Sequence, residues 1–236
     1  MIDENDLSQE LTWFNEKRAG RVVAALQKVN INAMYAPNKA RALAAILDMI
    51  PEGARVARGD SMSVDQVGVL EELKKRNRNE ILDPFERDAA GYTILKGKER
   101  YNAQRMAFLA DVFITGANAV TLDGKIVSTD AVGNRVAPVL FGPEKVILVI
   151  GTNKIVNDLE SARQRIREVA APINAKRHAL KHHITEFGKL PCVVTGFCTD
   201  CNSDWRICRY TVIIEGSMIT QKDRINVVLV GEDLGI

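Results

Sequence analysis

The chain has 236 residues, of which 46% are hydrophobic and 26% are charged. This composition is sufficient for an ordinary buried core and argues against a largely disordered chain. The 32 basic and 30 acidic residues leave a formal net charge of +2, so no global field favours nucleic acid or an anionic membrane.

The N-terminus begins with the acidic segment MIDENDLSQELTWF, whereas a signal peptide begins with basic residues followed by an apolar stretch. No apolar run approaches the roughly 20 residues that a membrane-spanning helix needs. We therefore expect a cytoplasmic protein with neither a membrane nor a nucleic acid as partner. A reducing compartment disfavours stable disulfides, which shifts the interpretation of the four cysteines towards metal ligation or redox chemistry.

The first part of the chain alternates between helical and extended patterns. Apolar residues return at helical spacing from Ser8 to about Val29, and Ser63 and Gln66 have the spacing of a capping box. The loop 59–63 exposes backbone N–H groups, so it either caps the next helix or binds a phosphate or carboxylate. The expected elements are helix 8–29, strand 31–36, helix 39–49, strand 54–57, helix 64–75, strand 80–82 and helix 99–110.

The second part continues the alternation. Asp123 and Gly124 form a two-residue turn signal between apolar pairs, which predicts a β-hairpin. The continuous apolar run 145–150 (KVILVI) is typical of a strand that is covered on both faces of a parallel sheet. The expected elements are strand 111–115, hairpin 117–129, helix 133–140, strand 145–150, helices 159–169 and 172–183, and strands 211–214 and 226–230. Together they predict an α/β fold, with an open, largely parallel sheet, helices on both faces and an inserted hairpin.

All four cysteines lie in one short window, at Cys192, Cys198, Cys201 and Cys208. The spacing C-x5-C-x2-C-x6-C can bring four thiolates to one inorganic centre, and both tetrahedral zinc and a 4Fe-4S iron–sulfur cluster take four thiolates. The spacing matches neither a paired zinc ribbon nor the bacterial ferredoxin run, so the metal stays open, with a preference for the iron–sulfur cluster. The alternatives are buried cysteines without a ligand and a redox-active pair at Cys198 and Cys201.

Polar residues follow several of the predicted strands. Ligands of open α/β sheets bind beyond the carboxyl ends of the strands, so these residues predict a site for a small anionic organic acid or a phosphate. Each also has a structural interpretation, such as a turn, a helix cap or a solvated side chain. The candidate ligand-binding residues are Asp60, Ser61, Ser63, Gly116, Asn118, Asp130, Asn134, Arg135, Asn153 and Lys154.

The three histidines lie on the predicted helix 172–183, among lysines and an arginine. His178 and His182 have the i, i+4 spacing of a metal-binding pair, but no third ligand is evident. We expect this basic helical face to be solvated.

The segment 111–156 resembles a known family. It reads DVFITGANAVTLDGKIVSTDAVGNRVAPVLFGPEKVILVIGTNKIV, and it is similar to the core of LUD-domain (lactate utilisation, formerly DUF162) proteins in its DG turn, its GNR, its GP before a strand and its GTNKIV after it. Upstream, GDSMSVDQVGVLEEL resembles the serine-containing loop and helix of that family. The pattern PC-x2-TG-x-C-x-DC…RIC resembles the cysteine-bearing branch.

This resemblance implies a Rossmann-like sheet related to the superfamily of sugar-phosphate isomerases and CoA transferases. It also implies a role in oxidising lactate or a related organic acid, as a component of an oxidoreductase system with iron–sulfur partner proteins. Two alternatives remain: a transferase or isomerase acting on CoA esters or sugar phosphates, with Glu215 as its catalytic residue, and a non-catalytic assembly subunit with structural zinc. A homo-oligomer is also expected.

The expected domain organisation has two parts. Residues 1–52 are an N-terminal helical segment packed on the domain, and residues 53–236 are a LUD-like α/β domain that includes the cysteine segment 192–208.

Overall fold

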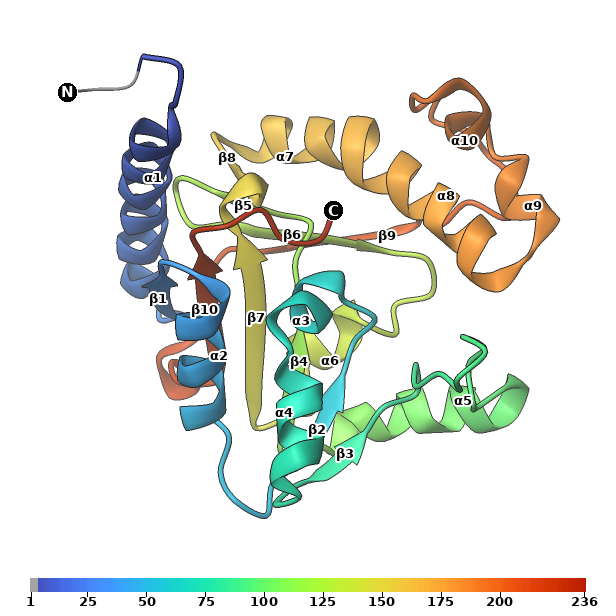
Figure 1. Cartoon of the computed structure of the whole chain (residues 1–236), viewed down its shortest axis with the longest axis horizontal. Coiled ribbons are helices and arrows are strands. Elements are labelled where there is room, and N and C mark those ends of the chain that lie inside the picture. Colours follow the sequence, from blue (N-terminus) through green and yellow to red (C-terminus); the bar gives the residue numbers. More distant parts are fainter. Residues whose placement is uncertain (1–3) are drawn as a thin grey trace.

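Six parallel strands form the main sheet of the computed structural model, which describes residues 4–236 (Figure 1). Their spatial order is β1-β10-β7-β4-β2-β3. The strands are β1 (Asn32–Ala36), β10 (Ile225–Val230), β7 (Lys145–Gly151), β4 (Val112–Thr115), β2 (Arg55–Arg58) and β3 (Glu80–Leu82). The central strands are continuously apolar because both faces of the sheet are covered. The predicted open, parallel α/β fold is confirmed.

Side chains of β7 alternate between two cores, one on each face of the sheet. Leu148 and Ile150 point into the first core, whereas Ile147 and Val149 point into the second. The first core is covered by α1 (Ser8–Lys28), α6 (Val136–Leu140) and the 3-10 turn Met106–Leu109. The second is covered by α2 (Lys39–Asp48), α3 (Met62–Val67) and α4 (Val69–Arg76). This packing fixes the strand ends on which the candidate site is built.

A second, four-stranded sheet lies beside the first core. Its order is β8-β5-β6-β9, formed by β8 (Ile155–Val156), β5 (Ala119–Thr121), β6 (Ile126–Asp130) and β9 (Tyr210–Ile214). The strands β5 and β6 are the predicted hairpin, which is confirmed. The predicted strand 211–214 also forms, but it pairs antiparallel with β6 and does not join the main sheet.

Most of the remaining helices lie on the side of the carboxyl ends of the main sheet, whereas α5 (Gly97–Arg105) lies beside β3 (Figure 1). In the picture α7 and α8 run across the tips of the central strands, and α9 and α10 lie at the far end of α8. The helices on this side are α7 (Leu159–Arg165), a π-helical turn (Ile166–Ala170), α8 (Ala171–His182), α9 (Thr185–Gly188) and α10 (Pro191–Thr195). Within residues 4–236, no helix combines the length and apolarity needed to cross a bilayer.

The predicted helix 64–75 is wrong in one respect, because two helices replace it. Gly68 has φ +80°, a left-handed conformation that interrupts the helix between α3 and α4. The predicted capping box is also wrong: Ser63 lies inside α3, and the residue that precedes this helix is Ser61, which makes no capping bond with its side chain. The hydroxyl oxygen of Ser63 instead accepts a hydrogen bond from Lys154.

The boundary between residues 1–52 and 53–236 stays a prediction. The N-terminal segment contributes α1, β1 and α2, and β1 pairs in parallel with β10 along its whole length.

Candidate functional site

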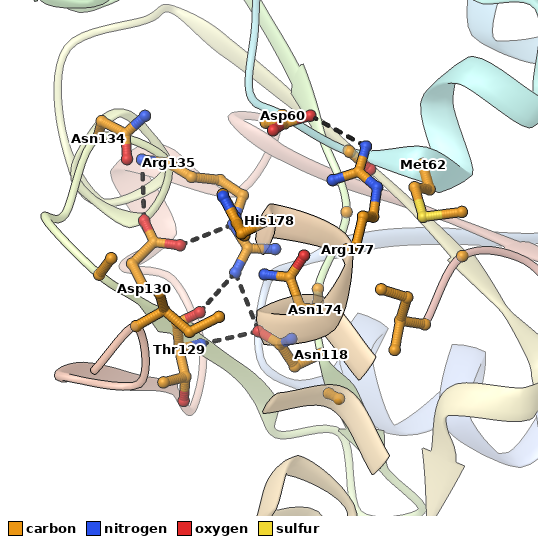
Figure 2. A pocket seen from close by; sticks show the side chains of 18 of the residues that line it. Asp60, Met62, Asn118, Thr129, Asp130, Asn134, Arg135, Asn174, Arg177 and His178 are labelled. Carbon is orange, nitrogen blue, oxygen red and sulfur yellow. Dashed lines mark hydrogen bonds and ion pairs between the residues drawn. The ribbon is translucent and has the colours of Figure 1, made fainter. Parts of the chain in front are cut away.

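A cavity of about 240 Å³ lies where the carboxyl ends of β2, β4 and β7 meet α8 and the hairpin sheet (Figure 2). Each strand is followed by a polar residue that lines it, because parallel strands end at the same edge of the sheet. Eight of the ten predicted ligand-binding residues line the cavity: Asp60, Ser61, Gly116, Asn118, Asp130, Asn134, Arg135 and Lys154.

One wall of the cavity is a rigid ion pair between Asp130 and Arg135. The Asp130 carboxylate accepts hydrogen bonds from the backbone N–H groups of Arg135 and Val136 and from Arg135 Nε, each at 2.9 Å. Arg135 Nη2 also donates to Asn118 Oδ1 at 3.0 Å and to the carbonyl of Thr129 at 2.8 Å (Figure 2). Both charged side chains are largely buried, so they neutralise each other and hold this wall in one geometry.

A second ion pair joins the loop after β2 to α8. Lys181 Nζ lies 2.8 Å and 3.0 Å from the two carboxylate oxygens of Asp60, and Arg177 Nη2 lies 3.6 Å away. Burial alone would raise the pKa of Asp60, but Lys181, Arg177 and Arg58 outweigh it and hold this pKa well below its usual range. Asp60 is therefore a carboxylate whose charge is matched by cations from α8.

Lys154 is the most deeply buried cation of the cavity, at 4% exposure. Its Nζ donates to Ser63 Oγ at 3.1 Å. Among the described residues no carboxylate forms an ion pair with it. Burial, and then the positive charges of Arg165 and Arg135, lower the pKa of Lys154 to about 7.

The four cysteines lie in α10 and in the loop that leads to β9. All four are half-buried and free. Burial raises the pKa of Cys192, and the negative charges of Cys201, Cys208 and Cys198 raise it further, so the four sulfurs are close enough to interact. Within residues 4–236, no three His, Cys, Asp or Glu side chains are placed so that they could hold a metal ion, and the predicted four-thiolate metal site stays a prediction.

Arg206 organises the cysteine loop. Its Nε donates to Cys208 Sγ at 3.2 Å, its Nη1 donates to the carbonyl of Cys201 at 2.7 Å, and its Nη2 lies 3.0 Å from Asp200 Oδ1. The backbone N–H of Asp200 in turn donates to Cys198 Sγ at 3.4 Å. A guanidinium and an amide thus face two of the sulfurs.

The cysteine loop reaches the cavity. Ile207 lines the main cavity, and Cys208 lines a small space of about 20 Å³ beside it, together with Asn118, Thr129 and Asn174. These three polar residues line the main cavity as well. The structure therefore places one candidate metal ligand, Cys208, beside the candidate ligand-binding residues.

A family model named LUD domain matches residues 19–230, which is most of the chain. The chain belongs to the LUD-domain family. The predicted family is thus confirmed, and membership links this LUD domain to lactate utilisation at the level of the family. No curated protein matches the sequence.

A solved structure of a DUF162 family protein from Deinococcus radiodurans is similar to this LUD domain. The two share 12% sequence identity with a TM-score of 0.51, and the alignment covers 92% of this chain and 98% of that chain. At this identity the likeness concerns the fold alone, and it agrees with the open α/β architecture described above.

Two of the predicted ligand-binding residues do not line the cavity of this LUD domain but hold residues that do. Ser63 holds Lys154, and Asn153 anchors the C-terminal segment, because its Oδ1 accepts from the backbone N–H of Leu234 at 3.1 Å. The next residue, Gly235, has φ +64°, and a side chain there would lie within 3 Å of both Ser63 Oγ and Lys154 Nζ. Gly235 itself lines the cavity, so the C-terminal segment is part of its wall.

Glu215 lies away from the cavity. It is exposed after β9, and its charge acts on Lys125 in the hairpin turn. The structure therefore does not bring it together with the residues that follow the parallel strands.

The basic face of α8 differs from its prediction, because part of it is turned inwards. His178 and His182 stack at 5.1 Å between ring centroids, and burial first of all lowers the pKa of each to about 4, so both rings are neutral at pH 7. The inward residues recur at helical spacing, which is the signal that sequence reasoning missed. They are Asn174, Arg177 and His178, which line the cavity, and Lys181, which pairs with Asp60.

Sequence reasoning also missed Arg100 of α5. Its guanidinium carbon lies 5.2 Å from the centroid of the Phe85 ring, and its buried Nε has no hydrogen-bond partner. Arg100 lines the cavity together with Phe85. No pattern in the surrounding polar stretch of sequence distinguishes this arginine from its solvated neighbours.

Proposed function

We propose that this LUD-domain protein binds a small carboxylate, such as lactate or pyruvate, beside a four-cysteine iron–sulfur centre, as a component of an oxidoreductase system for lactate or a related organic acid. One observation carries the proposal: the cysteine loop borders the cavity, through Ile207 in the cavity and Cys208 in the space beside it. A redox centre at this position would lie next to the bound acid.

The charge balance of the cavity supports an anionic ligand. Asp130 is neutralised by Arg135, and Asp60 is matched by the cations of α8. Arg100 then remains as a cation without an ion-pair partner among the described residues. Lys154 also has no such partner, and its pKa is lowered to about 7. An arginine whose buried Nε lacks an acceptor is suited to a carboxylate, which supplies two acceptor oxygens.

The size of the cavity supports a small ligand. Sites for drug-sized molecules occupy about 300 to 1,000 Å³. The cavity of about 240 Å³ is below that range, and polar side chains dominate its labelled lining (Figure 2). A three-carbon acid fits this volume and polarity better than an intact nucleotide or a CoA ester.

The number and placement of the thiols support a centre with four thiolate ligands. All four cysteines lie in one short segment, and the charges of Cys201, Cys208 and Cys198 act on Cys192. Within residues 4–236, no three His, Cys, Asp or Glu side chains are already placed to hold a metal ion, so the loop would have to draw its sulfurs together around the metal. In this proposal Cys192, Cys198, Cys201 and Cys208 would hold a 4Fe-4S cluster, which takes four thiolates. Such a cluster would supply one-electron transfer.

The residues of the chain have defined tasks in this proposal. Arg206 offsets the negative charge of Cys208, while Arg100 binds the carboxylate and Lys154 lines the cavity with it. The neutral rings of His178 and His182 leave the cavity charge unchanged at pH 7. Oxidation of a 2-hydroxy acid to a 2-oxo acid releases two electrons and two protons, so the proposal requires iron–sulfur partner proteins as acceptors.

Anaerobic purification tests the metal centre. We expect brown protein with visible thiolate-to-iron absorption and with equal amounts of iron and acid-labile sulfide. Cys198→Ser and Cys208→Ser should each lose this absorption, whereas Thr199→Ala, an exposed change in the same loop, should keep it. Colourless protein that binds one zinc ion through the same cysteines would support the alternative of a structural subunit and overturn the redox proposal.

Isothermal titration with L-lactate and pyruvate tests the anion site. Arg100→Gln should weaken binding about tenfold or more, because one charge-assisted hydrogen bond to a buried group is lost. Arg78→Gln changes an exposed arginine whose pair with Glu52 is also exposed, so binding should stay as in the wild type. Equal affinities in the two variants would contradict the assignment of the cavity.

A further inference from the structure

Lys154 is an unusual lysine, because it is neither solvated nor paired. Buried lysines are rare in proteins unless a carboxylate neutralises them. Lys154 is 4% exposed, and its Nζ has a single described hydrogen-bond partner, the neutral hydroxyl of Ser63 at 3.1 Å. It also lines the cavity. The fold thus holds a primary amine against the space that the proposed ligand occupies.

The surroundings of Lys154 favour its uncharged form. Arg165 is fixed beside it, since its Nη1 donates to the carbonyl of Asn118 at 2.8 Å and its Nε donates to that of Asn153 at 3.2 Å. Arg135 is equally fixed by Asp130. These two cations act on the lysine, and Asp233 acts on Arg165 from the C-terminal segment. Desolvation together with neighbouring cations is the arrangement that activates lysine as a nucleophile.

We propose that Lys154 forms a covalent imine with the carbonyl carbon of a 2-oxo acid bound in the cavity. The inference rests on the proposed function for its substrate class, a small organic acid. The lone pair of Nζ adds to the carbonyl carbon and forms the C–N bond. The carbonyl oxygen then leaves as water with the two protons of the amine, so the step needs no oxidant or reductant.

Three residues position the reacting groups for this step. The hydroxyl oxygen of Ser63 accepts a hydrogen bond from Nζ and fixes the position of the amine. Gly235 packs against both groups, so the C-terminal segment keeps bulk water away from the nitrogen. Arg100 lines the same cavity and carries the donor without a partner, which suits the carboxylate of the acid. A 2-oxo acid has its carboxylate directly beside the carbonyl carbon, so one small molecule carries both of the groups that the proposal requires.

Reductive trapping tests the imine. The full-length protein is incubated with pyruvate and cyanoborohydride, and the adduct is measured by intact mass and located by peptide mapping. We expect one reduced pyruvate adduct per chain, on Lys154. Lys154→Arg removes the primary amine and should lose the adduct, whereas Lys75→Arg removes an exposed lysine of α4 and should keep it. Peptide mapping of the wild type needs no variant, so it is decisive even if a substitution at Lys154 prevents folding.

The pH dependence of trapping is a second test. Because the pKa of Lys154 is lowered to about 7, the trapping rate should be half-maximal near pH 7, whereas exposed lysines should still be gaining reactivity well above pH 8. Equal labelling of exposed lysines would overturn the imine proposal.

Calorimetry with pyruvate separates this proposal from the proposed function. If pyruvate binds without an adduct, the imine is excluded and the anion site stands. If pyruvate neither binds nor forms an adduct, both proposals fail.

Discussion

The cavity and the cysteine loop are neighbours, but they are built in opposite ways. The cavity walls are strand ends and helix faces whose charged groups are buried and hydrogen-bonded, as in the pair of Asp130 and Arg135. The cysteine loop contains no strand, its sulfurs are only half-buried, and Phe197 and Trp205 within it are 59% and 43% exposed. The fold itself preorganises the cavity, whereas the loop relies on a few polar contacts made by Arg206.

This difference indicates which interactions stabilise each of the two regions. The cavity takes its shape from strand ends, helix faces and buried ion pairs of the fold itself. The cysteine loop would gain most from a bound metal, since thiolate ligation contributes folding free energy directly. Substitutions in the cavity should therefore affect global stability, and substitutions in the loop should affect local order.

The largest effect is expected from removing the carboxylate of Asp130. In Asp130→Ala the largely buried Arg135 loses its counterion, and two backbone N–H groups lose their acceptor. The free energy of unfolding should fall by about 3 kcal/mol, as measured by urea denaturation. Glu160→Ala breaks only an exposed pair with Arg163 at 3.8 Å and should change it by less than about 0.5 kcal/mol. Similar free energies of unfolding for the two variants would contradict the view that the cavity walls contribute to global stability.

Acidification should weaken the contact between the two regions. The ring of His178 lies 5.4 Å from that of Phe187, which lies 5.2 Å from that of Trp205 in the cysteine loop. The pKa values of His178 and His182 are lowered to about 4 in the folded chain, so the unfolded chain binds more protons at pH 5. Stability should therefore fall as the pH drops from 7 to 5.

The expected loss is about 2 kcal/mol for the pair, less than the full shifts because solvent screens His182. Urea denaturation at several pH values measures it. The double variant His178→Gln, His182→Gln should flatten the pH dependence, whereas His183→Gln, on an exposed residue just after α8, should not. An unchanged slope in the double variant would assign the effect to other groups.

A smaller effect is expected at the C-terminal wall of the cavity. Gly235→Ala places a methyl group 2.7 Å from Ser63 Oγ, at a residue with φ +64°. The free energy of unfolding should fall by about 1 kcal/mol, and pyruvate should bind more weakly because Lys154 is displaced. Gly20→Ala, in the interior of α1 with open space around it, should instead stabilise the chain slightly. Thermal denaturation compares the two, and a stabilised Gly235→Ala would contradict the packing described.

The smallest global effect is expected from Arg206→Gln. The metal-free chain should keep its free energy of unfolding within about 0.5 kcal/mol, because the loop is outside the core. Chymotrypsin should nevertheless cut faster at Phe197 and Trp205, and the fragments can be identified by mass spectrometry. Arg163→Gln, at an exposed position of α7, is the matched control. Unchanged protection in Arg206→Gln would mean that other contacts hold the loop.

The main sheet could be predicted because its strands carry their own signal. The run 145–150 is apolar without interruption, and β10 repeats this pattern. Of the second sheet only the hairpin of β5 and β6 could be predicted, because β8 has only two residues and β9 pairs with a strand far earlier in the chain. Pairing between such segments depends on tertiary packing and leaves no local pattern.

The candidate site could also be predicted only in part. Residues that directly follow parallel strands, such as Asp60 and Lys154, were found because strand ends converge by topology. Arg177 and Arg100 were not found, since a cation on a helix has the same sequence pattern whether it faces water or a cavity.

The junction between the cysteine loop and β9 limits how the length of this region can change. The backbone N–H of Arg209, directly after Cys208, donates to the carbonyl of Asp130 at 2.9 Å, and Tyr210 then starts the ladder with β6. One extra residue here would either displace Cys208 or slip β9 by one position and exchange its inner and outer side chains. Insertions at the exposed Asp204 and Trp205, before Arg206, would lengthen a surface loop at a small cost in loop entropy. Relatives with the same four cysteines should therefore keep the distance from the fourth cysteine to the strand constant, while the spacing before it varies.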